Sequence, residues 1–137
     1  MVGRVLFKSG RLNPDGSIVG VDADTGVGDE PHYSGDITSA EQVQVYEPIM
    51  GDLEGRQTYT LLRAARYLKD NRILPRGFDK GQVPDEIAVV GEAATDPDFI
   101  GGSDLVTYRI RLGDVSGGVS VFVELKYRPC PSATCAT

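Results

Sequence analysis

The residues best suited to chemistry are three carboxylates that precede a predicted strand in the carboxy-terminal half. Asp96, Asp98 and Asp104 flank a Gly-Gly pair at residues 101 and 102. Calcium takes about six to eight oxygen ligands from carboxylates and backbone carbonyls. The spacing therefore predicts a calcium site at the three aspartates, although the pattern lacks the closing glutamate of an EF-hand. The commoner outcome for an Asp- and Gly-rich segment is a solvent loop built from Asx turns.

A second acidic cluster and the single histidine lie in a long predicted loop over residues 22–36. The carboxylates of the cluster are Asp22, Asp24, Asp29 and Glu30. A metal site is again one interpretation, but nothing in the flanking sequence fixes the geometry of the cluster, so a solvated loop is the expectation. His32 is a candidate general base with Asp29 or Asp36. Catalysis also needs a nucleophile and an orienting partner at a recognisable spacing, and the sequence supplies neither, so an enzyme is the least favoured class.

Lys69-Asp70-Asn71-Arg72 is a compact polar run where a predicted strand ends. An active-site interpretation pairs Lys69 with Asp70. More often such a run hydrogen-bonds the backbone at a bend, or forms a surface ion pair that contributes about 1 kcal/mol at most.

Six tyrosines are present without any tryptophan, at Tyr33, Tyr46, Tyr59, Tyr67, Tyr108 and Tyr127. Two or three of them on one exposed sheet face would form a stacking platform for sugar, as in carbohydrate-binding modules. Aromatic residues at strand spacing mostly stabilise sheets through cross-strand packing. Carbohydrate binding is therefore the alternative function and not the first one.

Both cysteines lie near the end of the chain, at Cys130 and Cys135. This spacing is compatible with a small disulfide loop and equally with two free thiols on a chain end. Zinc is poorly supported, because a structural site takes about four ligands and no second Cys/His pair exists. We expect a single domain over residues 1–128 and a flexible tail over residues 129–137.

The composition limits the classes of partner. The chain has 20 acidic and 14 basic side chains, and this net charge of -6 repels nucleic acids and anionic membrane surfaces. No apolar run approaches the roughly 20 residues that span a bilayer, and the first residues lack the apolar core of a signal peptide. We therefore expect a folded domain with neither a nucleic-acid partner nor membrane insertion.

The elements that would position these residues are short strands joined by turns rich in glycine and proline. Alternation of apolar and polar residues predicts strands near residues 3–8, 18–21, 42–50, 86–91, 105–112 and 119–127, with turns at 51–55 and 113–118. The last turn and its flanking strands give the strongest hairpin pattern. Together with residues 57–73, the count reaches about seven or eight strands, which predicts an all-β fold: a two-sheet antiparallel sandwich, jelly-roll-like, with long loops.

Residues 57–73 have an ambiguous pattern. Leu61, Leu62, Ala65 and Leu68 are at helical spacing, whereas the threonines and tyrosines of the segment favour a strand. A long antiparallel hairpin after the turn at 51–55, ending near Asn71, is the alternative to a helix.

Three stretches of sequence carry a resemblance to a known group of proteins. They are Val-Gln-Val-Tyr-Glu-Pro-Ile-Met-Gly-Asp (43–52), Leu-Leu-Arg-Ala-Ala-Arg-Tyr-Leu-Lys-Asp-Asn-Arg-Ile-Leu-Pro-Arg-Gly-Phe-Asp (61–79) and Asp-Phe-Ile-Gly-Gly-Ser-Asp-Leu-Val-Thr-Tyr-Arg-Ile (98–110). The region from about residue 31 to residue 127 resembles the heme-free carboxy-terminal β domain of some exported bacterial multiheme c-type cytochromes and related uncharacterised proteins. The resemblance implies an all-β domain, tips residues 57–73 towards strand, and implies no known reaction. No heme-attachment motif is present here, so any hemes would belong to another part of a longer protein.

The functional expectation is a non-catalytic accessory or interaction domain of a larger exported protein, in the periplasm or outside the cell. Its expected partners are other domains of that protein or separate proteins, with structural calcium as its only expected cofactor. The alternative is a carbohydrate-binding module, and a small enzyme that uses His32 comes third.

Overall fold

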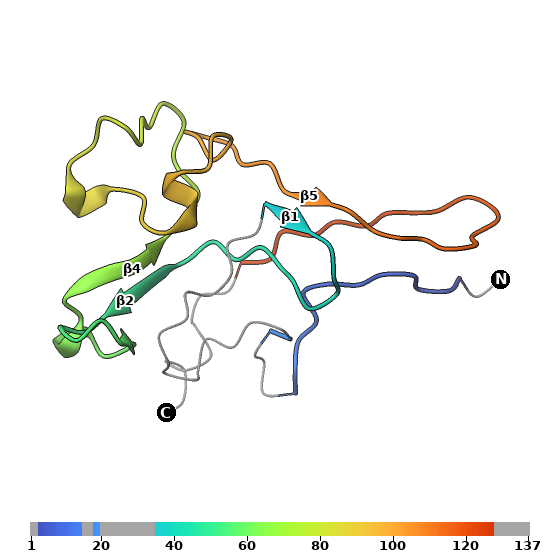
Figure 1. Cartoon of the computed structure of the whole chain (residues 1–137), viewed down its shortest axis with the longest axis horizontal. Helices are drawn as coiled ribbons and strands as arrows, with labels where there is room; N and C mark the ends of the chain where they lie inside the picture. The colour runs from blue at the N-terminus through green and yellow to red at the C-terminus, as the bar shows by residue number, and fades with distance from the viewer. Residues whose placement is uncertain (1–2, 15–17, 20–34, 128–137) are drawn as a thin grey trace.

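The structure is a computed structural model that describes residues 3–14, 18–19 and 35–127 (Figure 1). In these ranges it contains short strands and single 3-10 turns, without an α-helix. The elements in chain order are β1 (Asp36–Ile37), β2 (Pro48–Gly51), β3 (Gln57–Thr58), η1 (Leu61–Arg63), β4 (Arg66–Asp70), η2 (Asp85–Ile87), η3 (Glu92–Ala94) and β5 (Thr107–Tyr108). No helical element of the described chain has the length and apolarity needed to cross a membrane.

An antiparallel sheet of three strands, in the order β3-β2-β4, confirms the β character of the fold. The turn that joins β2 to β3 forms where the sequence predicts one. The Asp52 carboxylate accepts the Arg56 amide at 2.8 Å, and the Gly55 amide donates to the Asp52 carbonyl at 3.0 Å. Gly55 has φ +80°, a left-handed conformation in which a side chain would be strained, so glycine is the residue that closes this turn.

Residues 57–73, whose sequence pattern is ambiguous, form strands β3 and β4 with one 3-10 turn between them. The helical alternative would bury Leu61 and Leu62, yet these side chains are 87% and 98% exposed. Strand β4 ends at Asp70, next to the predicted end at Asn71. Across from it, Gly51 lies under Leu68, because a β-carbon at residue 51 would lie 2.7 Å from a Leu68 methyl group.

The core is small. Its fully buried apolar side chains are Ile37, Ile49, Ala93 and Phe99. Ala93 and Phe99 form one cluster, against which Tyr46, Leu74 and Val89 pack from three other parts of the chain. The core therefore lies between the strands and the long connection of residues 72–104, which Figure 1 shows looping out beyond the end of β4.

The described strands are fewer than the sequence predicts, and one pair runs in the other direction. Strands β1 and β5 pair in parallel, and each has two residues. The predicted strands over 3–8 and 119–127 have no strand assignment, and the one over 86–91 is reduced to a 3-10 turn and an isolated bridge from Val90 to Asp70. A sandwich of seven or eight strands is therefore not confirmed by the described residues. The physical reason is that alternation measures side-chain pattern, whereas a strand needs a partner for its backbone groups.

Candidate metal centre

The three aspartates predicted from the sequence converge in the structure. Asp96, Asp98 and Asp104 each offer one carboxylate oxygen, and these oxygens all lie within 4.8 Å of one another. Asp98 is exposed, and the other two are half-buried. The cluster lies in the loop between η3 and β5, directly beside the buried Phe99.

A tight turn brings Asp104 back to Asp98. Ile100 and Ser103 form an isolated antiparallel bridge around the Gly-Gly pair, with backbone bonds of 3.0 and 3.1 Å. A β-carbon at Gly101 would lie 2.5 Å from the Phe78 carbonyl oxygen, so only glycine fits between this turn and residues 75–78. The two glycines thus serve close packing of the turn, which the sequence analysis had assigned only to loop formation and exposed carbonyls.

Backbone amides orient two of the carboxylates. The Asp98 amide donates to Asp96 Oδ1 at 3.0 Å, which is the Asx turn expected from the sequence. The Leu105 amide donates to Asp98 Oδ1 at 3.4 Å and links the two ends of the loop. The predicted Asx turn and the predicted cluster therefore occur together, since the turn directs the carboxylates towards a common point.

Asp104 is held from a distant part of the chain. The Tyr46 hydroxyl donates to Asp104 Oδ2 at 2.6 Å, and Gln44 Nε2 donates to the same oxygen at 3.4 Å. Burial, followed by the Asp104 carboxylate, raises the pKa of Tyr46 well above its ordinary value, so the phenol keeps its proton. The sequence analysis missed both residues, because no local spacing connects residues 44 and 46 to residue 104.

Crowding of like charge is the main electrostatic feature of the cluster. Loss of hydration, and then the negative charges of Asp96 and Asp104, raise the pKa of Asp98 above its ordinary value. A bound cation would reverse this penalty, because it favours the ionised form of every carboxylate around it. The arrangement can therefore bind a hard cation through oxygen ligands.

Lys80 binds backbone carbonyls of the loop that carries the cluster. Its ammonium group donates to the Ala93 carbonyl at 3.0 Å and to the Asp96 carbonyl, and lies 5.8 Å from the centre of the Phe99 ring. One cation thus joins the end of η3, the first metal-candidate residue and the core aromatic ring. Sequence analysis did not single out Lys80.

The polar run at the end of β4 has a structural role. Lys69 is buried, and its Nζ lies 3.1 Å from the Val45 carbonyl oxygen and 3.5 Å from Glu47 Oε1. Asp70 pairs with Arg72 at 2.6 Å, and the Arg72 side chain is more than half exposed. The run therefore forms a backbone bond and an ion pair, the two structural roles favoured from the sequence.

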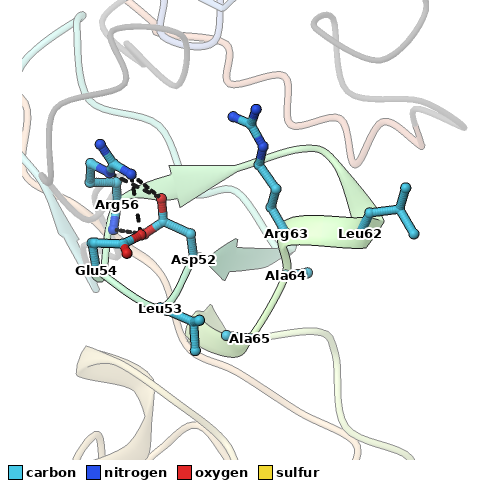
Figure 2. Close-up of a pocket in the computed structure, with 8 residues that line it drawn as sticks. All are labelled: Asp52, Leu53, Glu54, Arg56, Leu62, Arg63, Ala64 and Ala65. Carbon is cyan, nitrogen blue, oxygen red and sulfur yellow. Dashed lines mark hydrogen bonds and ion pairs between the residues drawn. The ribbon is translucent and has the colours of Figure 1, made fainter.

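A shallow hollow of about 580 Å³ lies beside the turn of the three-stranded sheet. Figure 2 shows Asp52, Glu54 and Arg56 along one side, joined by ion pairs of 3.0 and 3.2 Å. The Arg56 amide and guanidinium lower the pKa of Asp52, which therefore stays ionised. Both carboxylates of the hollow, Asp52 and Glu54, are therefore paired with Arg56.

Four of the five described tyrosines contact other protein groups, whereas Tyr127 is 89% exposed. Tyr67 lies under the Arg72 guanidinium at 5.7 Å, and the ring of Tyr108 lies edge-on to Phe7 at 6.3 Å. These ring contacts are of the packing kind that the sequence favours for the tyrosines. The second acidic cluster, His32 and both cysteines lie outside the described residues.

Among the candidate sites predicted from the sequence, the three aspartates are the residues that the structure brings together. Comparison of the chain with protein-family models, with curated proteins and with solved structures gives no match.

Proposed function

We propose that this chain is a non-catalytic β domain whose Asp96, Asp98 and Asp104 bind a structural calcium ion. Its role is that of an accessory or interaction domain of a larger exported protein. The observation that supports the proposal is the convergence of three carboxylates from residues 96–104 within 4.8 Å.

Calcium suits the geometry and the chemistry of the cluster. Calcium-oxygen distances are about 2.3–2.6 Å, so two ligands on opposite sides of one ion lie up to about 5 Å apart. The carboxylate oxygens fall within this limit without movement of the loop. Oxygen ligands of a negatively charged loop favour a hard cation over the softer metals that select nitrogen and sulfur.

The ion would have a structural effect because its ligand residues are hydrogen-bonded to segments that are far apart in the sequence. Asp104 is bonded to Tyr46, and Asp96 carries the carbonyl that Lys80 binds. An ion across the cluster would therefore tie the loop before β5 to the segment that leads into β2. Ligand binding to the folded state alone must raise stability as the concentration rises.

Thermal unfolding of the chelated protein, with and without calcium at constant ionic strength, tests the proposal. We expect the midpoint to rise with calcium, by about 2.7 kcal/mol in unfolding free energy at a concentration 100 times the Kd. Asp98→Asn should abolish the rise. Asp114→Asn removes the same charge from an exposed position outside the cluster and should retain it. An unchanged midpoint of the unsubstituted protein at millimolar calcium would refute the metal site.

The exported parent protein is the second part of the proposal and rests on the resemblance described above. The full-length gene product tests it. We expect Cys-x-x-Cys-His heme-attachment motifs and an export signal in the same reading frame. A reading frame without either would contradict this part and leave the metal site unaffected.

A further inference from the structure

Residues 110–127, called the arm below, extend away from the three-stranded sheet and double back (Figure 1). All of its residues are exposed except the half-buried Val115. The exposed apolar side chains include Val121, Phe122, Val123, Leu125 and Tyr127, at 77–91% exposure. Large exposed apolar patches mark interaction sites, and this run of exposed apolar side chains makes the arm a candidate interface.

The returning limb of the arm, residues 119–127, has the character of an unpaired strand. Lys126 Nζ lies 3.1 Å from Glu124 Oε2, which places these two side chains on one face, as extended backbone requires. Val121, Val123 and Leu125 then share the other face. Within the described chain, the arm forms one backbone bond, from Val115 to Gly113 in its turn, and no ladder pair. Such a strand is a template for pairing with another chain.

The accessible surface of the protein is large enough to supply a dimer interface. The chain exposes 10323 Å². A compact monomer of 14.7 kDa exposes roughly 6,900 Å² by the usual scaling with mass, a difference of about 3,400 Å². A stable homodimer buries about 2,000–5,000 Å² in total, and half of that on each protomer. This surplus, taken over the whole chain, exceeds what one protomer contributes to such an interface, and the exposed arm supplies part of it.

We infer that the arm binds a second copy of this chain, with residues 119–127 of the two copies paired antiparallel about a two-fold axis. Two-fold dimers are the commonest closed assemblies. The limb suits self-association because its two charges, Glu124 and Lys126, cancel and so bring no like-charge repulsion to the pairing. The apolar faces of the two paired limbs then form one common surface. The inference goes beyond the proposed function and does not depend on the metal site.

The mass of the protein in solution tests the inference, measured by light scattering after size exclusion in excess chelator. We expect a mass of 29.4 kDa, twice the 14.7 kDa of one chain. Val123→Lys on the apolar face should give the monomer mass. Ser120→Lys puts the same charge on the opposite face of the same limb and should leave the dimer intact. A monomer mass for the unsubstituted protein up to its highest soluble concentration would overturn the inference.

Hydrogen exchange of the unsubstituted protein locates the interface and does not depend on whether Val123→Lys folds. Amides of residues 119–127 should exchange more slowly as protein concentration rises, because pairing buries them. Equally fast exchange of these amides at a concentration where the mass is that of a dimer would place the contact elsewhere and overturn the inference. Because chelator is present throughout, failure of the metal proposal leaves these outcomes unchanged.

Discussion

Replacement of Asn71 by alanine should destabilise the domain more than the few side-chain atoms it removes would suggest. The Asn71 side chain is completely buried at the end of β4. Its Nδ2 donates to the Val45 carbonyl at 2.9 Å, and its Oδ1 accepts the Glu47 amide at 2.9 Å. These two bonds take the place of ladder bonds along the segment that enters β2.

The cost can be worked out bond by bond. In the alanine variant the Val45 carbonyl keeps Lys69 Nζ at 3.1 Å, whereas the Glu47 amide loses its side-chain acceptor. The lost bond to the Val45 carbonyl contributes about 1 kcal/mol, and the orphaned Glu47 amide contributes about 1–3 kcal/mol. We therefore expect a loss of about 2–4 kcal/mol, against a total of about 5–15 kcal/mol for a typical domain.

Urea unfolding followed by far-ultraviolet circular dichroism, in excess chelator, measures this loss. Gln82→Ala is the matched control, because it removes an exposed amide side chain. The control should change the unfolding free energy by less than about 0.5 kcal/mol. A similarly small change for Asn71→Ala would refute the assignment of these two bonds as the anchor of residues 45–47.

Two further predictions concern the metal loop. Gly101→Ala places a β-carbon against the Phe78 backbone and should lower the unfolding free energy, measured in urea, by about 1–3 kcal/mol. Gly118→Ala is the control, because its β-carbon would lie in open space, and it should not lower the unfolding free energy. Equal values for the two variants would contradict the close packing of the turn. The raised pKa of Asp98 predicts that, without calcium, stability present below the ordinary pKa of about 3.9 is lost as pH rises through the folded-state pKa. Asp98→Asn should therefore raise the melting temperature at pH 7 in chelator, and a decrease would contradict the cost of ionising Asp98 in the folded state.

The metal cluster could be predicted from sequence because its chemistry is local. All three aspartates fall within residues 96–104, and an Asx turn with a Gly-Gly turn suffices to bring them together. Tyr46 and Gln44 could not be predicted, because they reach Asp104 through tertiary packing across 58 and 60 residues of chain. A polar side chain that packs from a remote segment leaves no periodic signal in the sequence.

Strand prediction succeeded in part at the turn of residues 51–55, where the predicted strand over 42–50 is shortened to β2, and failed at the turn of residues 113–118, although that turn gave the strongest hairpin pattern. The turn closed by Asp52 and Gly55 joins β2 to β3, so the strand there follows from sequence. Residues 119–127 alternate as well as any segment of the chain, yet have no strand assignment. Lys69 and Asn71 show a second limit of sequence prediction. Both side chains are polar, yet both are buried, because they donate to the Val45 carbonyl where no strand pairs with it.

Tyrosine-sensitised luminescence of terbium, a calcium analogue, tests the proposed metal site most directly. The Tyr46 hydroxyl lies 2.6 Å from a carboxylate oxygen of Asp104, and the chain has no tryptophan to compete as donor. We expect emission that saturates with terbium and is displaced by calcium. Emission should be lost in Asp98→Asn, which removes a ligand, and should fall in Tyr46→Phe, which removes the tyrosine bonded to Asp104. Absence of emission from the unsubstituted protein, or emission that calcium does not displace, would contradict calcium binding at Asp96, Asp98 and Asp104.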